Sequence, residues 1–276
     1  MRRNLFTTVR SEGALLPPDF LQRLIDPKSA IDGLTAAAYH LAEGERLNEV
    51  ASRSWNRLLG VWASFQGASV GLKEADAASG LTREKWLLPL FQELGYGRLQ
   101  SAKSFVIDGK TYPISHVWAR SPIHLVGRGV ELDVRTAGVA GAARTTPHGL
   151  VQEFLNRSNE YLWGFVSNGL KLRVLRDSKS FTRQAFVEFD LLAMFEGQAY
   201  SDFALLWLLC HESRVELEDD HPERCWLEKW TEAARRDGTR ALDRLRDGVE
   251  AAIKVLGSGF LKHICAATIK SAGSDN

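Results

Sequence analysis

The sequence feature that most constrains the fold is a β-hairpin signal at Asn168-Gly169. Asn-Gly supplies the positive φ angles that a tight two-residue turn needs, and apolar runs flank the dipeptide on both sides. After the turn, leucine and valine residues alternate with Lys171 and Arg173. Because successive side chains of a strand point to opposite faces, this run predicts a half-buried strand with a basic solvent face.

A second pair of strands is predicted upstream, at residues 123–126 and 130–134. Two glycines separate the runs, which is typical of a tight turn. The second run carries Glu131, Asp133 and Arg135 at alternate positions, so a strand there would point all three side chains to one face. A helix is predicted at 148–157, before the Asn-Gly hairpin. This order predicts one sheet containing all these strands, with helix 148–157 packed across it.

The order of a strand, a strand with alternating acids, a helix and a strand resembles the core of PD-(D/E)xK nucleases. The run LVQEFLNRSNEYLWGFVSNGLKLRVLRD at 150–177 resembles a segment of type I and type IIG restriction subunits. The segments TREKWLLPLFQELGYGRL at 82–99 and FALLWLLCHESR at 203–214 extend the likeness. From Gly13 to His263 the chain resembles the N-terminal region of large adenine-methylating restriction–modification proteins of type IIG and DISARM-type phage-defence systems.

The resemblance implies an α/β fold: a PD-(D/E)xK restriction-nuclease-like core with a mixed β-sheet, flanked by N-terminal and C-terminal helical regions. It also implies a DNA-engaging module of a restriction–modification or phage-defence system. The implied partners are duplex DNA and a methyltransferase domain or subunit. The methyltransferases of this family carry a glycine-rich cofactor loop and an Asn-Pro-Pro-Tyr motif, and neither motif occurs here. The chain by itself is therefore not expected to methylate DNA.

In an active PD-(D/E)xK site, two acids on adjacent strands hold Mg²⁺, and a lysine near the second acid orients the attacking water. Glu131 and Asp133 are the candidate metal ligands, with Arg135 at the lysine position and Gln152 as a further candidate on the helix. Arginine does not release its proton, and the preceding strand offers His124 in place of the first acid. We therefore expect a degenerate core without a cofactor. A Mg²⁺-dependent endonuclease is the alternative, and a polar strand face with a salt bridge is the structural alternative.

The net charge of the whole chain is only +1, so a DNA-binding surface has to come from a local patch. The candidate phosphate-binding residues gather around the predicted helix start and along the basic strand: Arg144, His148, Lys171, Arg173 and Arg176. A merely solvated basic face is the alternative. Another possibility is an adaptor that docks a methyltransferase or helicase through the apolar run 203–209 and does not touch DNA.

Five segments are predicted along the chain. They are a flexible N-terminal arm (1–18), a helical subdomain (19–79), the nuclease-like domain (80–190), a helical connector (191–265) and a disordered tail (266–276). The three cysteines show no CxxC spacing, and the sequence contains neither a secretory signal nor an apolar run long enough for a membrane span. A reducing cytoplasm is therefore the expected location.

Local signals predict further elements. Apolar spacing predicts helices at 20–25 and 46–65, and turn residues predict a hairpin at 105–114. A strand is predicted at 185–189. Thr82 is expected to cap the start of a helix, and Gly257-Ser258-Gly259 is expected to break the last one.

Overall fold

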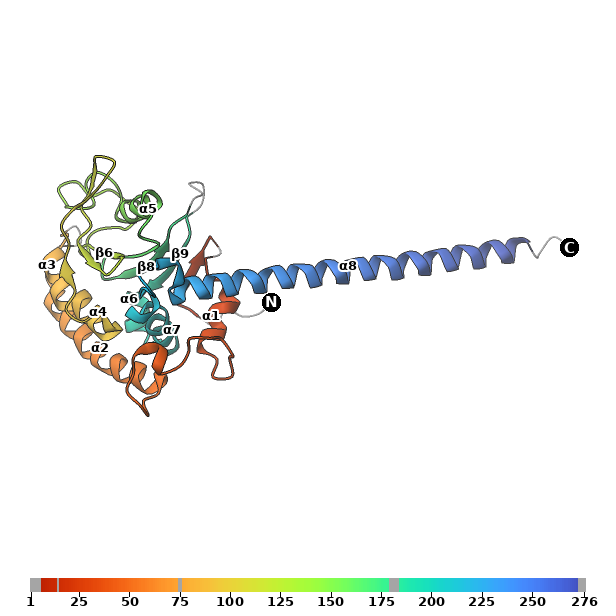
Figure 1. The fold of residues 1–276 in the computed structure, drawn as a ribbon, viewed down its shortest axis with the longest axis horizontal. Helices are drawn as coiled ribbons and strands as arrows, with labels where there is room; N and C mark the ends of the chain where they lie inside the picture. Colours follow the sequence, from red (N-terminus) through yellow and green to blue (C-terminus); the bar gives the residue numbers. More distant parts are fainter. Residues whose placement is uncertain (1–5, 14, 74–75, 179–183, 273–276) are drawn as a thin grey trace. The chain divides into compact units, whose positions relative to one another are not determined.

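The computed structural model describes residues 6–13, 15–73, 76–178 and 184–272. The chain divides into two units, Met1–Thr231 and Glu232–Asn276. The first unit is a mixed α/β structure in which a seven-stranded mixed sheet is flanked by helices (Figure 1). The second unit holds most of one long helix, α8 (Trp226–Ala272), whose first residues belong to the first unit. No helix in the described part of the chain combines the length and apolarity that crossing a membrane requires.

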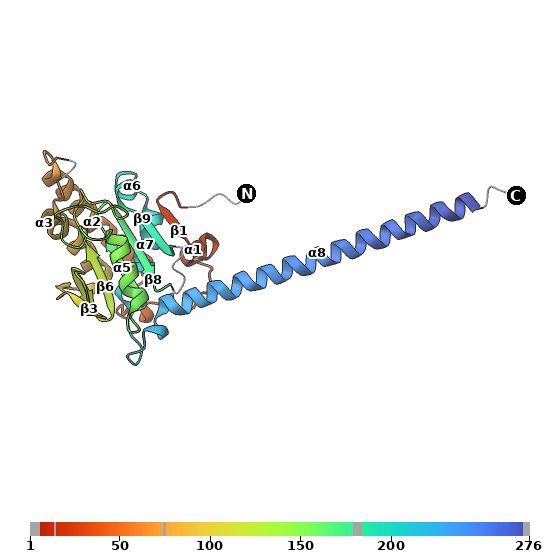
Figure 2. The ribbon, with the colours of Figure 1, turned by 90° about the horizontal axis from the view of Figure 1, so that it is seen from above.

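The sheet places distant parts of the chain next to one another. Its seven strands lie in the order β1 (Val9–Glu12), β9 (Phe186–Asp190), β8 (Lys171–Arg176), β7 (Trp163–Ser167), β6 (Ser121–Leu125), β5 (His116–Trp118) and β2 (Gln100–Ser101). Neighbouring strands run antiparallel except for β6 and β7, which are parallel. A separate two-stranded hairpin is formed by β3 (Phe105–Ile107) and β4 (Lys110–Tyr112). Figure 2 shows β1 beside β9.

Parallel strands need a crossover, and α5 (Pro147–Arg157) provides it between β6 and β7. The helix begins at Thr146, whose side chain accepts a hydrogen bond from the Gly149 amide at 3.0 Å, and Pro147 suits the first turn. Its apolar face is fully buried against the sheet. The cluster between them includes Leu150, Val151, Phe154 and Leu155 from the helix and Val166, Leu175 and Phe186 from the strands.

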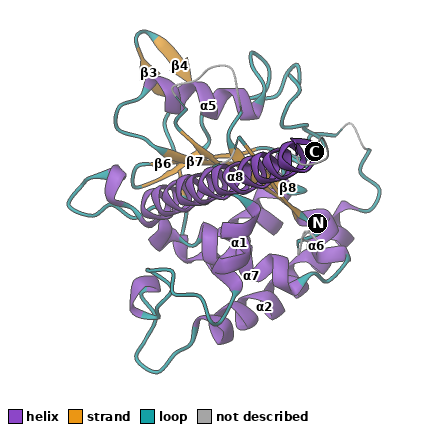
Figure 3. Cartoon of the chain, turned by 90° about the vertical axis from the view of Figure 1, so that its right-hand side faces the viewer, coloured by secondary structure: helices purple, strands orange, loops and turns teal. Residues whose placement is uncertain are grey.

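The opposite face of the sheet is covered by several helices, so both faces are buried. Figure 3 shows α5 on one side and α1, α2 and α7 on the other. The remaining elements are α1 (Pro18–Ile25), η1 (Ala37–Tyr39), α2 (Leu47–Ser69), the helical run α3 (Ser79–Thr82), η2 (Arg83–Leu87), α4 (Leu88–Phe91) and η3 (Gln92–Tyr96), then α6 (Leu191–Glu196), α7 (Tyr200–Cys210), η4 (Glu212–Arg214) and η5 (Pro222–Arg224). Aromatic rings fill this layer. Trp62 lies 4.9 Å from Trp86 and 5.5 Å from Phe195, measured between ring centroids.

Several elements predicted from the sequence are confirmed. The structure contains the Asn168-Gly169 hairpin, the 105–114 hairpin and the helices near 20–25, 46–65 and 148–157. The strand near 185–189 is also present as β9. The strands at 123–126 and 163–174 share one sheet, and helix 148–157 packs across it, as expected.

The predicted strand at 130–134 is wrong, because this segment lies in the long loop between β6 and α5. Its backbone groups bond elsewhere. The Val130 carbonyl accepts from the side-chain amide of Asn168 at 2.9 Å, and the Leu132 carbonyl accepts from the His148 amide at 3.0 Å. Val130 and Leu132 are buried, which explains the strand-like alternation. Glu131, Asp133 and Arg135 therefore do not form a row on a strand face.

Three other local predictions also differ from the structure. Thr82 lies inside the 79–96 helical run, where its hydroxyl accepts from the Arg128 amide at 3.1 Å instead of capping a helix start. Residues 257–259 continue α8, because its helical backbone extends to Ala272. Within the arm expected at 1–18, residues 9–12 form β1, which pairs with β9. Residues 273–276 of the expected tail lie outside the described residues.

Among the glycines that follow β6 in the chain, Gly127 should tolerate a larger side chain least. A Cβ built there would lie 1.5 Å from the Ala77 carbonyl oxygen. Backbone atoms do not move aside as a flexible side chain does, so Gly127→Ala should lower the free energy of unfolding by about 1–3 kcal/mol or more. Urea denaturation measures this change.

The matched control is Gly60→Ala in the exposed interior of α2, where a Cβ meets nothing within 4 Å. This change should raise the free energy of unfolding by about 0.5–1 kcal/mol, because alanine is the better helix former. Equal stability of the Gly127→Ala protein and the wild type would contradict the contact with Ala77.

Candidate functional site

The predicted site residues are brought together around the guanidinium of Arg173. Nη1 and Nη2 of Arg173 donate to the two carboxylate oxygens of Asp133 at 2.6 and 2.7 Å and form a bidentate ion pair. Its Nε donates to Glu188 Oε2 at 2.5 Å, and Nη1 also donates to His148 Nδ1 at 3.1 Å. The guanidinium carbon lies 4.5 Å from the ring centre of Phe186. We call Arg173, Asp133, Glu188 and His148 the Arg173 cluster.

Four separate elements deliver the members of the Arg173 cluster. Arg173 and Glu188 face each other across β8 and β9, as directly paired positions of the antiparallel ladder. His148 belongs to the first turn of α5. Asp133 comes from the 126–146 loop, which its buried neighbour Leu132 ties to the start of α5. The cluster therefore joins the loop, the helix and the sheet.

Burial and hydrogen bonding together influence the charges in the cluster. The Arg173 side chain is only 4% exposed, so its positive charge requires the two carboxylates. Hydrogen bonding to Arg173 lowers the pKa of the Asp133 carboxyl, although that side chain is 54% exposed. Burial lowers the pKa of His148 to about 4, so the imidazole is neutral at pH 7 and its Nδ1 accepts a hydrogen bond from Arg173 Nη1. Its buried Nε2 has no partner among the described residues.

Arg173, predicted on the solvent face of its strand, is buried because helices cover both faces of β8. His148, predicted as a phosphate contact at a helix start, is buried in the first turn of α5. Arg176 is also engaged. Its Nε and Nη2 donate to the two Glu228 oxygens at 2.6 and 2.9 Å. Of the predicted DNA-binding residues, Lys171 remains half-buried and Arg144 remains exposed.

The predicted nuclease residues do not converge. Glu131 and Arg135 are exposed on the loop, while Asp133 is held by Arg173. Gln152 lies on α5, where its amide nitrogen donates to the Arg176 carbonyl at 3.0 Å and to Asn156 at 2.9 Å. In the described residues, Glu131 and Asp133 belong to no group of three metal-ligating side chains.

Two acids that partner the basic residues were missed by the sequence analysis. Glu188 interrupts the apolar run of β9, and a lone acid in a buried strand is a signal for a cross-strand cation. Glu228 lies in the first turn of α8, where it also accepts from Trp163 Nε1 at 2.8 Å. No local pattern links it to Arg176, because 52 residues separate the two.

Acid should weaken the fold of the first unit before its carboxylates titrate. Burial lowers the pKa of four histidines: His116, His124 and His148 to about 4 and His211 to about 3. Their folded pKa values lie below the unfolded value, so the unfolded chain binds more protons between about pH 6.5 and 4. The free energy of unfolding is therefore fully present above pH 6.5 and should fall as the pH drops through this window.

Urea denaturation at several pH values between 7.5 and 4.5 measures this slope. His148→Gln should reduce the proton uptake on unfolding by up to about one proton. The control is Asn48→Gln at the exposed start of α2, which changes no titratable group and should leave the slope unchanged. A wild-type stability that is flat from pH 7 to 5 would contradict the buried neutral histidines.

Comparison with known proteins identifies no family: no family model matches the chain, and no curated protein or solved structure is significantly similar to it.

Proposed function

We propose that the chain is a DNA-engaging module of a restriction–modification or phage-defence system, built on a degenerate nuclease-like core. The observation that carries this proposal is the order of elements. The helical run 79–96, β2, β5, β6, α5 and β7 follow one another along the chain, and the four strands are neighbours in that same order. The β3–β4 hairpin is an insertion between β2 and β5. This order of a helix, three antiparallel strands, a helix and a parallel fourth strand supports a PD-(D/E)xK-like core.

The charges of this core favour binding without cleavage. A metal-dependent nuclease needs carboxylates on the two strands before the crossover helix, to hold Mg²⁺ beside the scissile phosphate. β5 and β6 carry no acid and offer His116 and His124, which are both buried. Asp133, in the loop that follows β6, is held in an ion pair with Arg173. The alternative, a Mg²⁺-dependent endonuclease using Glu131 and Asp133, therefore has less support.

The surface left for DNA is smaller than the sequence analysis proposed. Within the 126–146 loop, the Thr136 amide donates to the Ala142 carbonyl at 2.9 Å, which brings the flanking Arg135 and Arg144 toward the base of one subloop. Both arginines are exposed, and Lys171 lies near enough to Asp133 to lower its pKa. We define Arg135, Arg144 and Lys171 as the basic loop patch. The patch carries three positive charges, whereas the Arg173 cluster beside it carries a net charge of −1, because Arg173 faces both Asp133 and Glu188. The sum stays positive.

The basic loop patch predicts weak duplex binding that falls steeply with salt. Each phosphate contact contributes about 0.9 to the slope of log affinity against log salt concentration, so replacing all three residues by glutamine should reduce the slope by up to about 3. Fluorescence anisotropy with a labelled duplex of random sequence measures the slope.

The control replaces Lys28, Arg46 and Arg53 by glutamine, because these basic residues lie next to or on α1 and α2, across the sheet from α5. This variant has the same net charge and should keep the wild-type slope. Equal slopes for the two triple variants, or no binding by the wild type at low salt, would overturn the proposal. Plasmid nicking with Mg²⁺ that disappears in Glu131→Gln would favour the endonuclease.

A second candidate function, an interaction module, is favoured by the exposed face of α8. The α7 region once expected to dock a partner is unsuitable, because residues 203–209 are buried in the first unit. In the second unit, large apolar side chains repeat every three or four residues and are more than half exposed: Leu242, Leu245, Val249, Ile253 and Leu256. Such a stripe on one helix face is typical of a coiled-coil seam.

The charges beside the apolar stripe are compatible with a second copy of the same helix. Residues 232–256 carry six basic and five acidic side chains, so two copies would repel one another little. Arg246 lies 3.5 Å from Asp243 and Lys254 lies 2.6 Å from Glu250, on the same helix, which leaves the apolar stripe to make the contact.

Replacing Leu245 and Val249 together by asparagine should therefore convert a self-associated chain into a monomer. Both side chains are exposed, so the first unit should keep its stability. Sedimentation equilibrium at micromolar concentrations measures the mass, and Arg244→Gln with Asp247→Asn is the control on the charged side of the same turns. A wild-type chain that stays monomeric would contradict the dimer.

A further inference from the structure

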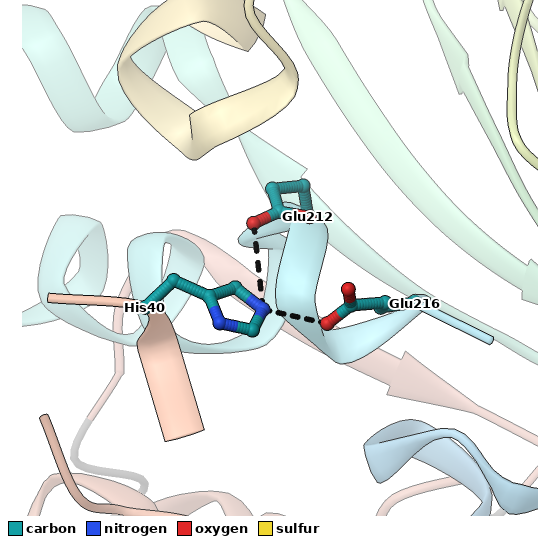
Figure 4. A group of neighbouring side chains, drawn as sticks. All are labelled: His40, Glu212 and Glu216. Atoms are coloured by element: carbon teal, nitrogen blue, oxygen red, sulfur yellow. Dashed lines mark hydrogen bonds and ion pairs between the residues drawn. The ribbon is translucent and has the colours of Figure 1, made fainter. Parts of the chain in front are cut away.

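Three side chains from distant parts of the first unit converge at its surface. His40 Nε2 lies 2.6 Å from Glu216 Oε2 and 4.0 Å from Glu212 Oε1 (Figure 4). One ligand atom from each residue lies within 4.8 Å of the others, and within the described ranges no other histidine, cysteine, aspartate or glutamate side chains form such a group of three. We call these residues the His40 triad.

A buried anchor fixes the position of His40. Its neighbour Tyr39 is 1% exposed and stacks on Trp207, with ring centroids 5.3 Å apart. The Tyr39 hydroxyl donates to the Leu208 carbonyl of α7 at 2.8 Å. The segment that carries His40 is therefore fastened to the helix that leads directly into Glu212.

The same anchor fixes Glu212 and Glu216. Glu212 opens η4, and Arg214 within that turn is fully buried. The Arg214 guanidinium lies 3.7 Å from the Tyr39 ring centre, and it donates to the carbonyls of Gly33 (at 3.0 Å) and Ala38. The segments that carry His40 and Glu212 are thus both fixed by the packing of Tyr39, Trp207 and Arg214, as a preorganised ligand set requires.

The Glu212 carboxylate is held without a hydrogen bond, although the charged Arg214 lies in the same turn. The Glu212 side chain is 13% exposed, and no hydrogen-bond donor reaches it from any described residue. A carboxylate held away from water normally accepts hydrogen bonds or contacts a cation. Glu216 places a second carboxylate on the other side of His40, and a bound cation would offset both negative charges. The low exposure of Glu212 separates the His40 triad from an exposed acidic cluster.

We propose that His40, Glu212 and Glu216 bind one divalent transition-metal ion, with Zn²⁺ preferred over Mn²⁺. One imidazole nitrogen and two carboxylate oxygens form a donor set that suits Zn²⁺, whereas Mg²⁺ favours oxygen ligands alone. Two ligands about 2.0–2.2 Å from one ion lie roughly 3.3–3.5 Å apart in a tetrahedron. The observed 2.6 and 4.0 Å bracket this spacing, so small side-chain movements complete the site. Water fills the remaining position.

The alternative is that His40 and Glu216 form an ordinary surface ion pair. The chain provides a matched comparison in His221, whose Nδ1 lies 2.9 Å from Glu223 Oε1 with both side chains half exposed. That pair lacks a second converging carboxylate and belongs to no group of three among the described residues. A generic affinity of histidine–glutamate pairs for zinc would appear equally at both places.

Calorimetric titration of the metal-stripped full chain with Zn²⁺ at pH 7.5 tests the proposal. The wild type should bind one equivalent through the His40 triad. His40→Ala and Glu216→Gln should each weaken this binding by more than the roughly 10–100-fold that loss of an outer-shell partner costs. His221→Ala should bind like the wild type, and excess Mg²⁺ should not compete.

A stability measurement distinguishes lost binding from lost folding. His40 and Glu216 are both about half exposed, so their variants should keep the wild-type melting temperature without metal. Saturating Zn²⁺ should raise the melting temperature of the wild type and of His221→Ala, and should leave that of His40→Ala unchanged. Absence of zinc binding by the wild type, or equal affinities for wild type and His40→Ala, would overturn the site.

Discussion

The structure depends on the neutralisation of one buried guanidinium. Arg173 lies between two packed layers, where an unpaired charge would cost several kcal/mol. Asp133 and Glu188 compensate it from opposite sides, one from a loop and one from the neighbouring strand. A loop of 21 residues between β6 and α5 thereby acquires a fixed point on the sheet. Asp133, one residue of the predicted catalytic row, thus has a structural role, whereas Glu131 and Arg135 lie exposed on the loop.

The elements that could be predicted from the sequence are those specified by local chemistry. Gly169 supplies the positive φ of the β7–β8 turn, the Asn168 side chain accepts from the amides of Leu170 and Lys171, and Thr146-Pro147 starts a helix. The failure at 130–134 has a physical cause. Alternation of apolar residues indicates which side chains are buried. Val130 and Leu132 are buried although they lie in a loop, and their carbonyls accept hydrogen bonds from Asn168 and His148. Periodicity does not reveal where the backbone hydrogen bonds go.

The candidate site was less predictable than the fold, because its contacts are long-range. The bond from Arg173 to Asp133 spans 40 residues, and the His40 triad joins positions 176 residues apart. The sequence singled out Asp133, His148 and Arg173 without indicating that they meet each other. The proposed DNA contact accordingly moves from the strand to the loop. There Arg135 and Arg144 remain exposed after the structural ion pairs are formed.

The position of β1 has a consequence for the order of folding during synthesis. Val9 pairs with Phe189, so β1 cannot join the sheet until β9, which begins about 180 residues later in the chain, has been synthesised. At typical translation rates of 5–20 residues per second, that interval lasts roughly 10–40 s. Throughout it, residues 9–12 have no sheet to join, and the β9 edge becomes available only after β8 is complete. Closure of the sheet is thus a late event on the ribosome, and a nascent chain stalled before residue 190 presents an open edge to chaperones or to other chains.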